Sequence, residues 1–277
     1  MIAAALVFTL QSSAQVQTPQ ASPKGEVEQL VGLTKVEVTY FRPAKKGRLV
    51  FGDLVPYGRV WRTGANNNTT VSFETSVEIN GLKLEAGTYA LYTTPKAQNW
   101  EVVFYKSTDN WGLPREWNEE YVALKTTIYP EVLPYEVEYF SIAVTPKSHF
   151  EGSIDLSWEK TLVRIPFKTP THEITMNSIE TSLNDAAKPS DYYAAGTYLF
   201  STNNDLTRAL EYVSRAIDMQ NEAPFYMLRQ KSLIQAAMGD KKSAIETAKK
   251  SLSAAEKAGN EDYVKMNRNS ILEWSKS

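Results

Sequence analysis

The hydrophobic pattern of this chain changes its period once, near Pro170, and that change divides the chain in two. Between residues 26 and 168 apolar residues recur at every second position in many short segments, as in TKVEVTYF at 34–41. A period of two is typical of half-buried strands. From 169 to 277 the spacing becomes 3.6, which is typical of amphipathic helices. The pattern predicts an antiparallel β domain, a β-sandwich or barrel-like fold, at 26–168, followed by an all-α domain at 169–277.

The tightest turn of the β domain can be placed from its residues. Asn80-Gly81 separates two arms of alternating apolar residues, which end at Ile79 and restart at Leu82. Both central residues of a type I′ turn need positive φ, which Asn and Gly tolerate best. The sequence therefore predicts a two-residue hairpin at this position.

A repeat occurs within the helical half. Asn204-Asp205, followed by Ala209, matches Gly239-Asp240, followed by Ala244, at an offset of 35 residues. This spacing resembles tetratricopeptide repeats, in which a turn precedes a helix with a small residue where two helices cross. The match is degenerate because the first copy has Asn in place of Gly. We expect a tetratricopeptide-like helical domain, and a plain helical bundle is the alternative.

The N-terminal residues predict the location of the protein. An apolar run, IAAALVFTL at 2–10, precedes small residues up to Ala14 and is too short to span a bilayer. This pattern is typical of a secretory signal peptide at 1–14, cleaved near Ala14, although the usual basic start is missing. Residues 15–25 are polar and predict a linker. The expected location is periplasmic or cell-envelope, with no membrane span elsewhere in the chain.

Composition and motifs give no indication of several classes of function. The net charge of −2 produces no global field that would attract nucleic acid or acidic membrane lipids. Cysteine is absent, and the two histidines, His149 and His172, lack the spacing of a zinc site. The chain has no nucleophile elbow, phosphate-binding loop or dinucleotide fingerprint. We therefore expect no metal and no cofactor, and a catalytic role would depend on carboxylates.

One segment is strongly basic, and it contains the candidate site. Residues 42–62 hold six cations against the single acid Asp53. Arginine guanidinium groups suit carboxylate or phosphate, and the Gly64-Ala65 step leaves backbone N–H groups open to an anion. The candidate ligand-binding residues are Arg48, Trp61, Arg62, Asn66 and Thr69.

A structural interpretation of the same residues stays open. The arginines could instead pair with carboxylates at the edge of the core, as most such residues do. Because Trp61 beside Arg62 indicates a packed environment, we expect a structural role for Arg62 and a site role for Arg48.

Four separated motifs resemble one known family. They are SPKG at 22–25, YFRPAKKGRLVFGDLVPYGRVWRTGANNNTTVSF at 40–73, AGTYALYTTP at 86–95 and NWGLP at 110–114. In this order they are similar to the exported bacterial domain of unknown function family 2911, of the Bacteroidota type, over residues 22–168. The resemblance implies a β-rich fold, a signal peptide and, in many members, a tetratricopeptide-like extension. It assigns no catalytic residue. The family's hallmark residues correspond to Gly47, Arg48, Gly52, Pro56, Gly58, Trp61, Arg62, Gly64, Ala65, Asn66 and Thr69.

These observations favour an exported, non-catalytic module that binds a ligand or partner. The ligand would be an anionic small molecule or a glycan at the β domain, and a protein would bind the helical domain. One alternative is a hydrolase acting on an envelope glycan or ester, in which carboxylates catalyse and arginines hold an anionic group. The other is a purely structural envelope protein.

Overall fold

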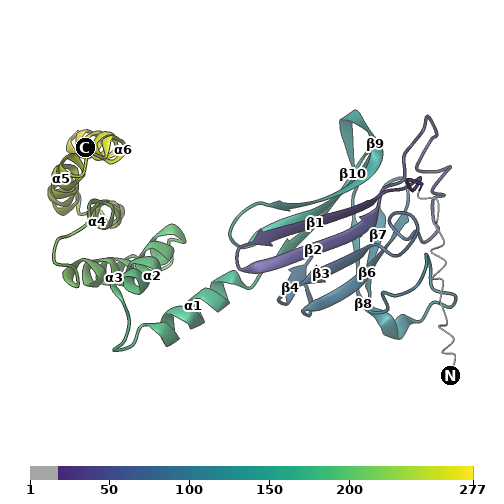
Figure 1. Cartoon of the computed structure of the whole chain (residues 1–277), viewed down its shortest axis with the longest axis horizontal. Helices are drawn as coiled ribbons and strands as arrows, with labels where there is room; N and C mark the ends of the chain where they lie inside the picture. Colours follow the sequence, from purple (N-terminus) through teal and green to yellow (C-terminus); the bar gives the residue numbers. More distant parts are fainter. Residues whose placement is uncertain (1–17, 277) are drawn as a thin grey trace, which may run out of the picture. The chain divides into compact units, whose positions relative to one another are not determined.

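The computed structural model describes residues 18–276, and the chain divides into two compact units between His172 and Glu173. Two antiparallel sheets are followed by helices, which confirms the predicted order of a β domain and an all-α domain (Figure 1). The expected signal peptide at 1–14 lies outside the described residues. Among residues 18–276, no helix combines the length and apolar character needed to cross a membrane.

The β domain has a six-stranded sheet and a four-stranded sheet. The first has the order β1 (Lys24–Val31), β2 (Thr34–Phe41), β3 (Thr70–Phe73), β6 (Gly87–Pro95), β7 (Trp100–Tyr105) and β8 (Val122–Ile128). The second has the order β5 (Leu82–Leu84), β4 (Val77–Ile79), β10 (Glu151–Lys168) and β9 (Glu131–Pro146). A single 3-10 turn (Glu119–Tyr121) precedes β8. Strand β1 thus begins two residues before the expected start of the β domain.

Alternating apolar residues form the core of this unit. Along β2 the side chains of Val36, Val38 and Tyr40 are buried, as a period of two requires. They belong to one hydrophobic cluster with residues of both sheets, including Phe104 of β7 and Ile165 of β10. Burial of these apolar side chains on the two facing sides is the main stabilising term for the domain.

The predicted hairpin is confirmed. Strands β4 and β5 pair with Ile79 opposite Leu82, and φ is 49° at Asn80 and 79° at Gly81. Positive φ at both positions is what a type I′ turn requires.

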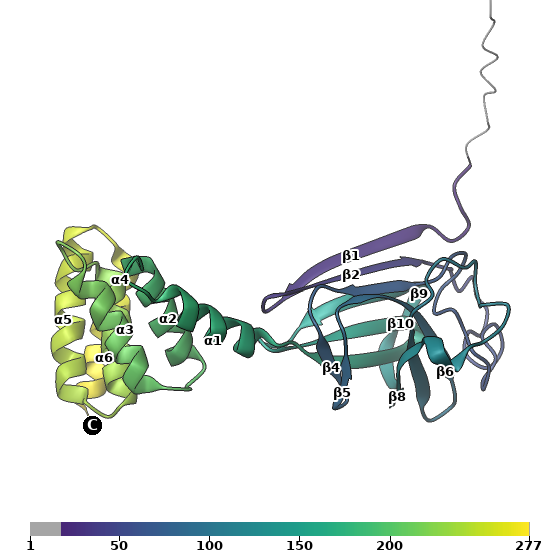
Figure 2. The same cartoon turned by 90° about the horizontal axis from the view of Figure 1, so that it is seen from below.

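A long loop between β2 and β3, residues 42–69, leaves the first sheet; we call it the basic loop. It lies at the end of the β domain away from the last residues of β10 (Figures 1 and 2). Isolated bridges join Ala44 to Tyr139 of β9 and Trp61 to Thr93 of β6. The loop also buries Phe51 in the core of the domain. These attachments hold the loop in a defined position on the sheets.

The helical unit contains helices of similar length. They are α1 (Thr171–Ser182), α2 (Pro189–Ser201), α3 (Leu206–Asp218), α4 (Phe225–Ala237), α5 (Lys241–Lys257) and α6 (Glu261–Ser275). Helix α1 begins two residues before the boundary of the compact unit. The closest packing is between α2 and α3, α4 and α5, and α5 and α6. Neighbours in sequence are therefore neighbours in space from α2 onward.

The 35-residue offset corresponds to the same local structure at both positions. The carboxylate of Asp205 accepts from the backbone N–H of Arg208 at 2.9 Å, and that of Asp240 accepts from Ser243 at 3.0 Å. Each aspartate is thus the N-cap of its helix, α3 or α5. Ala209 and Ala244, four residues later, are both fully buried where helices pack.

Candidate functional site

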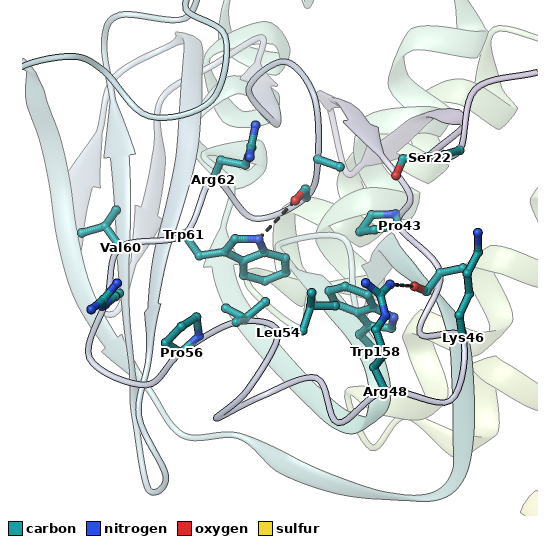
Figure 3. Close-up of a pocket in the computed structure, with 16 residues that line it drawn as sticks. Ser22, Pro43, Lys46, Arg48, Leu54, Pro56, Val60, Trp61, Arg62 and Trp158 are labelled. Atoms are coloured by element: carbon teal, nitrogen blue, oxygen red, sulfur yellow. Dashed lines mark hydrogen bonds between the residues drawn. The ribbon is translucent and has the colours of Figure 1, made fainter.

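The basic loop lines a cavity of about 550 Å³ (Figure 3). Most of its lining residues belong to that loop. Ala21 and Ser22, which precede β1, and Trp158 of β10 complete the lining among the described residues. The cavity therefore brings together three segments that are distant in sequence.

Two tryptophans form the base of the cavity. The rings of Trp61 and Trp158 stack with centroids 5.9 Å apart and planes 21° from parallel, and Phe51 contacts both edge-on. Trp61 Nε1 donates to Gly64 O at 3.1 Å, and Trp158 Nε1 donates to Glu138 O at 3.1 Å. Since both indole N–H groups bond to backbone carbonyls, the base is apolar and is held in place by the core.

All charged residues in the described lining are cations: Lys46, Arg48, Arg59 and Arg62. Arg48 is exposed, and it donates from Nε to Lys45 O at 2.9 Å and from Nη2 to Ala44 O at 2.6 Å. Arg62 is half-buried and donates from Nη1 to Asn66 O at 2.9 Å. Carbonyl oxygens orient both guanidinium groups without neutralising them.

Within residues 18–276, no carboxylate lies within 4.0 Å of the charged nitrogens of these four cations. The structural interpretation requires the arginines to pair with carboxylates, and the described residues offer no such partner. Four positive charges therefore surround an apolar base, an arrangement that focuses a positive potential in the cavity.

Three acidic side chains contact the neighbouring residues Lys45 and Lys46. Lys45 Nζ lies 2.7 Å from a carboxylate oxygen of Glu136 and 4.0 Å from Glu159, and Glu138 accepts from the backbone N–H of Lys46 at 2.7 Å. The hydrogen bond that Lys45 donates to Glu136 raises the pKa of Lys45 and lowers the pKa of Glu136. Lys45, which does not line the cavity, thus has an ion pair, whereas the lining cations have none with any of residues 18–276.

The structure brings together three of the five residues expected at the site. Arg48, Trp61 and Arg62 line the cavity, whereas Asn66 and Thr69 lie outside its described lining. Asn66, with φ of 56°, donates from Nδ2 to Ser22 O at 3.4 Å. The buried hydroxyl of Thr69 donates to Thr63 O at 2.6 Å. These two side chains shape the loop.

Gly64 allows two segments of this loop to approach closely. Its φ is 154°, and a Cβ there would lie 2.9 Å from Thr69 Oγ1 and 3.1 Å from Phe41 O. This close packing explains why position 64 holds a glycine, which has no Cβ.

Arg62 also joins two of the motifs found in the sequence. A Cβ on Gly112 would lie 3.0 Å from Arg62 Nη1, so the guanidinium packs directly on the backbone of the NWGLP segment. Beside it, the side-chain amides of Asn68 and Asn110 hydrogen-bond to each other at 2.9 Å. The segments 40–73 and 110–114 therefore form one continuous structure around this arginine.

Sequence reasoning missed Trp158 as a site residue. The alternation of Leu156 and Trp158 along β10 places both on the core side, but no local signal places Trp158 beneath Trp61.

Replacement of Arg62 by alanine is expected to cost about 1–2 kcal/mol of unfolding free energy, because a carbonyl loses a charged donor. Breaking a buried ion pair would cost more, about 3–5 kcal/mol. Urea unfolding measures the difference. Arg59→Ala is the matched control: the exposed Arg59 has no hydrogen bond or ion pair to another described residue, so we expect a change within about 0.5 kcal/mol. A loss for Arg62→Ala in the larger range would contradict this assignment.

Comparison with known proteins identifies the β domain. No curated protein and no solved structure matches the chain. One family model, described as Protein of unknown function (DUF2911), matches residues 22–167, which include the whole basic loop and both sheets except for the last residue of β10. This match covers more than half of the 277 residues, and the chain belongs to the DUF2911 family.

Proposed function

We propose that the β domain binds an anionic small molecule, or an acidic fragment of a glycan, in the cavity of the basic loop. The observation that supports it is the set of four lining cations without a carboxylate partner among the described residues. Arginine forks bind carboxylate and phosphate oxygens with directional, charge-assisted hydrogen bonds. An anion would also relieve the mutual repulsion of the four positive charges.

The same lining favours binding over catalysis. Among the described lining residues there is no carboxylate and no histidine, so the hydrolase alternative has no general base in this cavity. A purely structural role would leave the grouping of Arg48, Arg59 and Arg62 without an explanation. A non-catalytic binding module accounts for both features.

Export and a protein partner belong to the same proposal. The apolar run at 2–10 supports export to the periplasm or cell envelope. The equivalent N-caps at Asp205 and Asp240 and the buried Ala209 and Ala244 support a tetratricopeptide-like helical unit. Such units present a surface that binds other proteins.

Thermal shift with soluble anions tests ligand binding. Inorganic phosphate, small carboxylates and acidic sugars are added to the full chain, and at least one is expected to raise the melting temperature. At a hundredfold excess over Kd, the stabilisation is about 2.7 kcal/mol. Arg48→Gln should remove most of the shift, because it removes a charged donor from the cavity.

Lys249→Gln is the control for this experiment, since it removes an exposed cation of α5. The control should keep the full shift. Absence of stabilisation by every anion, or an undiminished shift in Arg48→Gln, would refute the binding proposal.

A further inference from the structure

Hydrogen-bonding groups in the cavity are nearly all donors. Of the described lining side chains, only the hydroxyl of Ser22 can accept a hydrogen bond. Nearby backbone carbonyls are already used: Lys45 O and Ala44 O by Arg48, and Gly64 O by Trp61. Neutral sugar hydroxyls, each a donor and an acceptor, would find few acceptors here. A group with acceptor oxygens only, such as a phosphate, matches this lining.

Apolar side chains stand beside these cations and remain exposed. Leu54 and Val60 line the cavity, and each is 38% exposed. Pro56 lies between them in the lining, as Figure 3 shows. Two more large apolar residues of the basic loop, Leu49 and Tyr57, are 59% and 48% exposed. A small soluble anion in the cavity would leave most of this apolar surface in water, which is unfavourable.

We propose that the basic loop docks on an anionic phospholipid surface, with a lipid phosphate in the cavity. Arg48, Arg59 and Arg62 donate to the phosphate, while Leu54 and Val60 enter the region between headgroups and acyl chains. Cations beside apolar side chains are the combination that binds such an interface, since each type of contact adds to the other. The net charge of the chain is −2, so its overall charge does not supply the attraction, which we assign to this loop. This inference rests on the proposed anion site.

Vesicle co-sedimentation of the full chain tests the charge contribution. Vesicles of phosphatidylcholine with added phosphatidylglycerol should bind the protein, and vesicles of pure phosphatidylcholine should not. Arg48→Gln/Arg59→Gln should weaken the partition about 30-fold, which corresponds to about 1 kcal/mol for each cation near the surface. Both residues are exposed, so the double variant should fold. Lys249→Gln/Lys250→Gln removes the same charge from α5 and should bind as the wild type does.

A second pair of variants tests the apolar contribution. Leu54→Ser/Val60→Ser should weaken binding to the anionic vesicles about tenfold, because the variant removes less apolar surface from water when it binds the membrane. Leu272→Ser, at a position 60% exposed on α6, is the matched control and should have no effect.

Two results would overturn the lipid inference. One is binding to anionic vesicles that neither double variant of the basic loop weakens. The other is stabilisation by inorganic phosphate that depends on Arg48, with no vesicle binding; this second result would leave the proposed anion site intact.

Discussion

Replacing Trp158 by alanine should lower the free energy of unfolding of the β domain by about 3–5 kcal/mol. Its side chain is 2% exposed and packs against Phe51, Trp61 and Phe140. Removal of the indole deletes a large apolar surface and leaves a void among rings that β10 and the basic loop hold apart. Closely packed interiors relax only in part around such a void, so the loss of contacts adds to the loss of burial.

Urea unfolding followed by tryptophan fluorescence measures this effect. Five of the six tryptophans lie between residues 61 and 158, so the signal reports mainly on the β unit. Trp111→Ala is the matched control, since Trp111 is 69% exposed, and it should change stability by less than about 0.5 kcal/mol. If Trp158→Ala were as stable as the wild type, the base of the cavity could not be part of the core.

Replacing Leu199 by alanine should destabilise the helical unit by about 2–5 kcal/mol. Leu199 of α2 is fully buried in a cluster with Val213 of α3 and Ile234 of α4. Three helices meet at this side chain, and a small unit has few other apolar groups to compensate for its loss. Alanine favours helices at least as well as leucine, so the loss is one of packing rather than of helix propensity.

Far-UV circular dichroism during urea unfolding follows this change, because the α-helices of residues 18–276 all lie from Thr171 onward. Leu272→Ala removes the same atoms from an exposed position of α6 and should be nearly neutral. Equal unfolding curves for the two variants would show that Leu199 is not part of a cooperative core.

Local patterns were sufficient for the secondary structure. Alternation at Val36, Val38 and Tyr40 predicted a strand, because a strand with one face on a core must bury every second side chain. Asn80-Gly81 predicted the hairpin, and the offset between Asp205 and Asp240 predicted equivalent helix starts. In each case the residues that determine the structure are within a few positions of one another.

The ordered motifs also identified the family, and the basic composition of residues 42–62 located the region of the candidate site. Composition could not predict which polar groups of this region bond to other parts of the protein and which stay available to a ligand. Arg62 is oriented by the carbonyl of Asn66, and Lys45 by Glu136, which follows 91 residues later. A hydrogen bond to a backbone carbonyl cannot be predicted from the side-chain types, because every residue has a carbonyl. An ion pair between distant segments depends on how the sheets bring those segments together.

Short-range spacing and composition were enough to predict a β half followed by a helical half, the tight turn and the basic character of one loop. The three-dimensional fold was needed to show that Trp61 and Trp158, 97 residues apart, stack to form the base of one cavity. The fold also places Lys46, Arg48, Arg59 and Arg62 in the lining of that cavity, whereas Glu136 pairs with Lys45, which lies outside the lining. Hydrophobic period reports whether a side chain faces the core. It carries no information on which distant side chain it meets there, since burial is not directional and many partners would satisfy it equally.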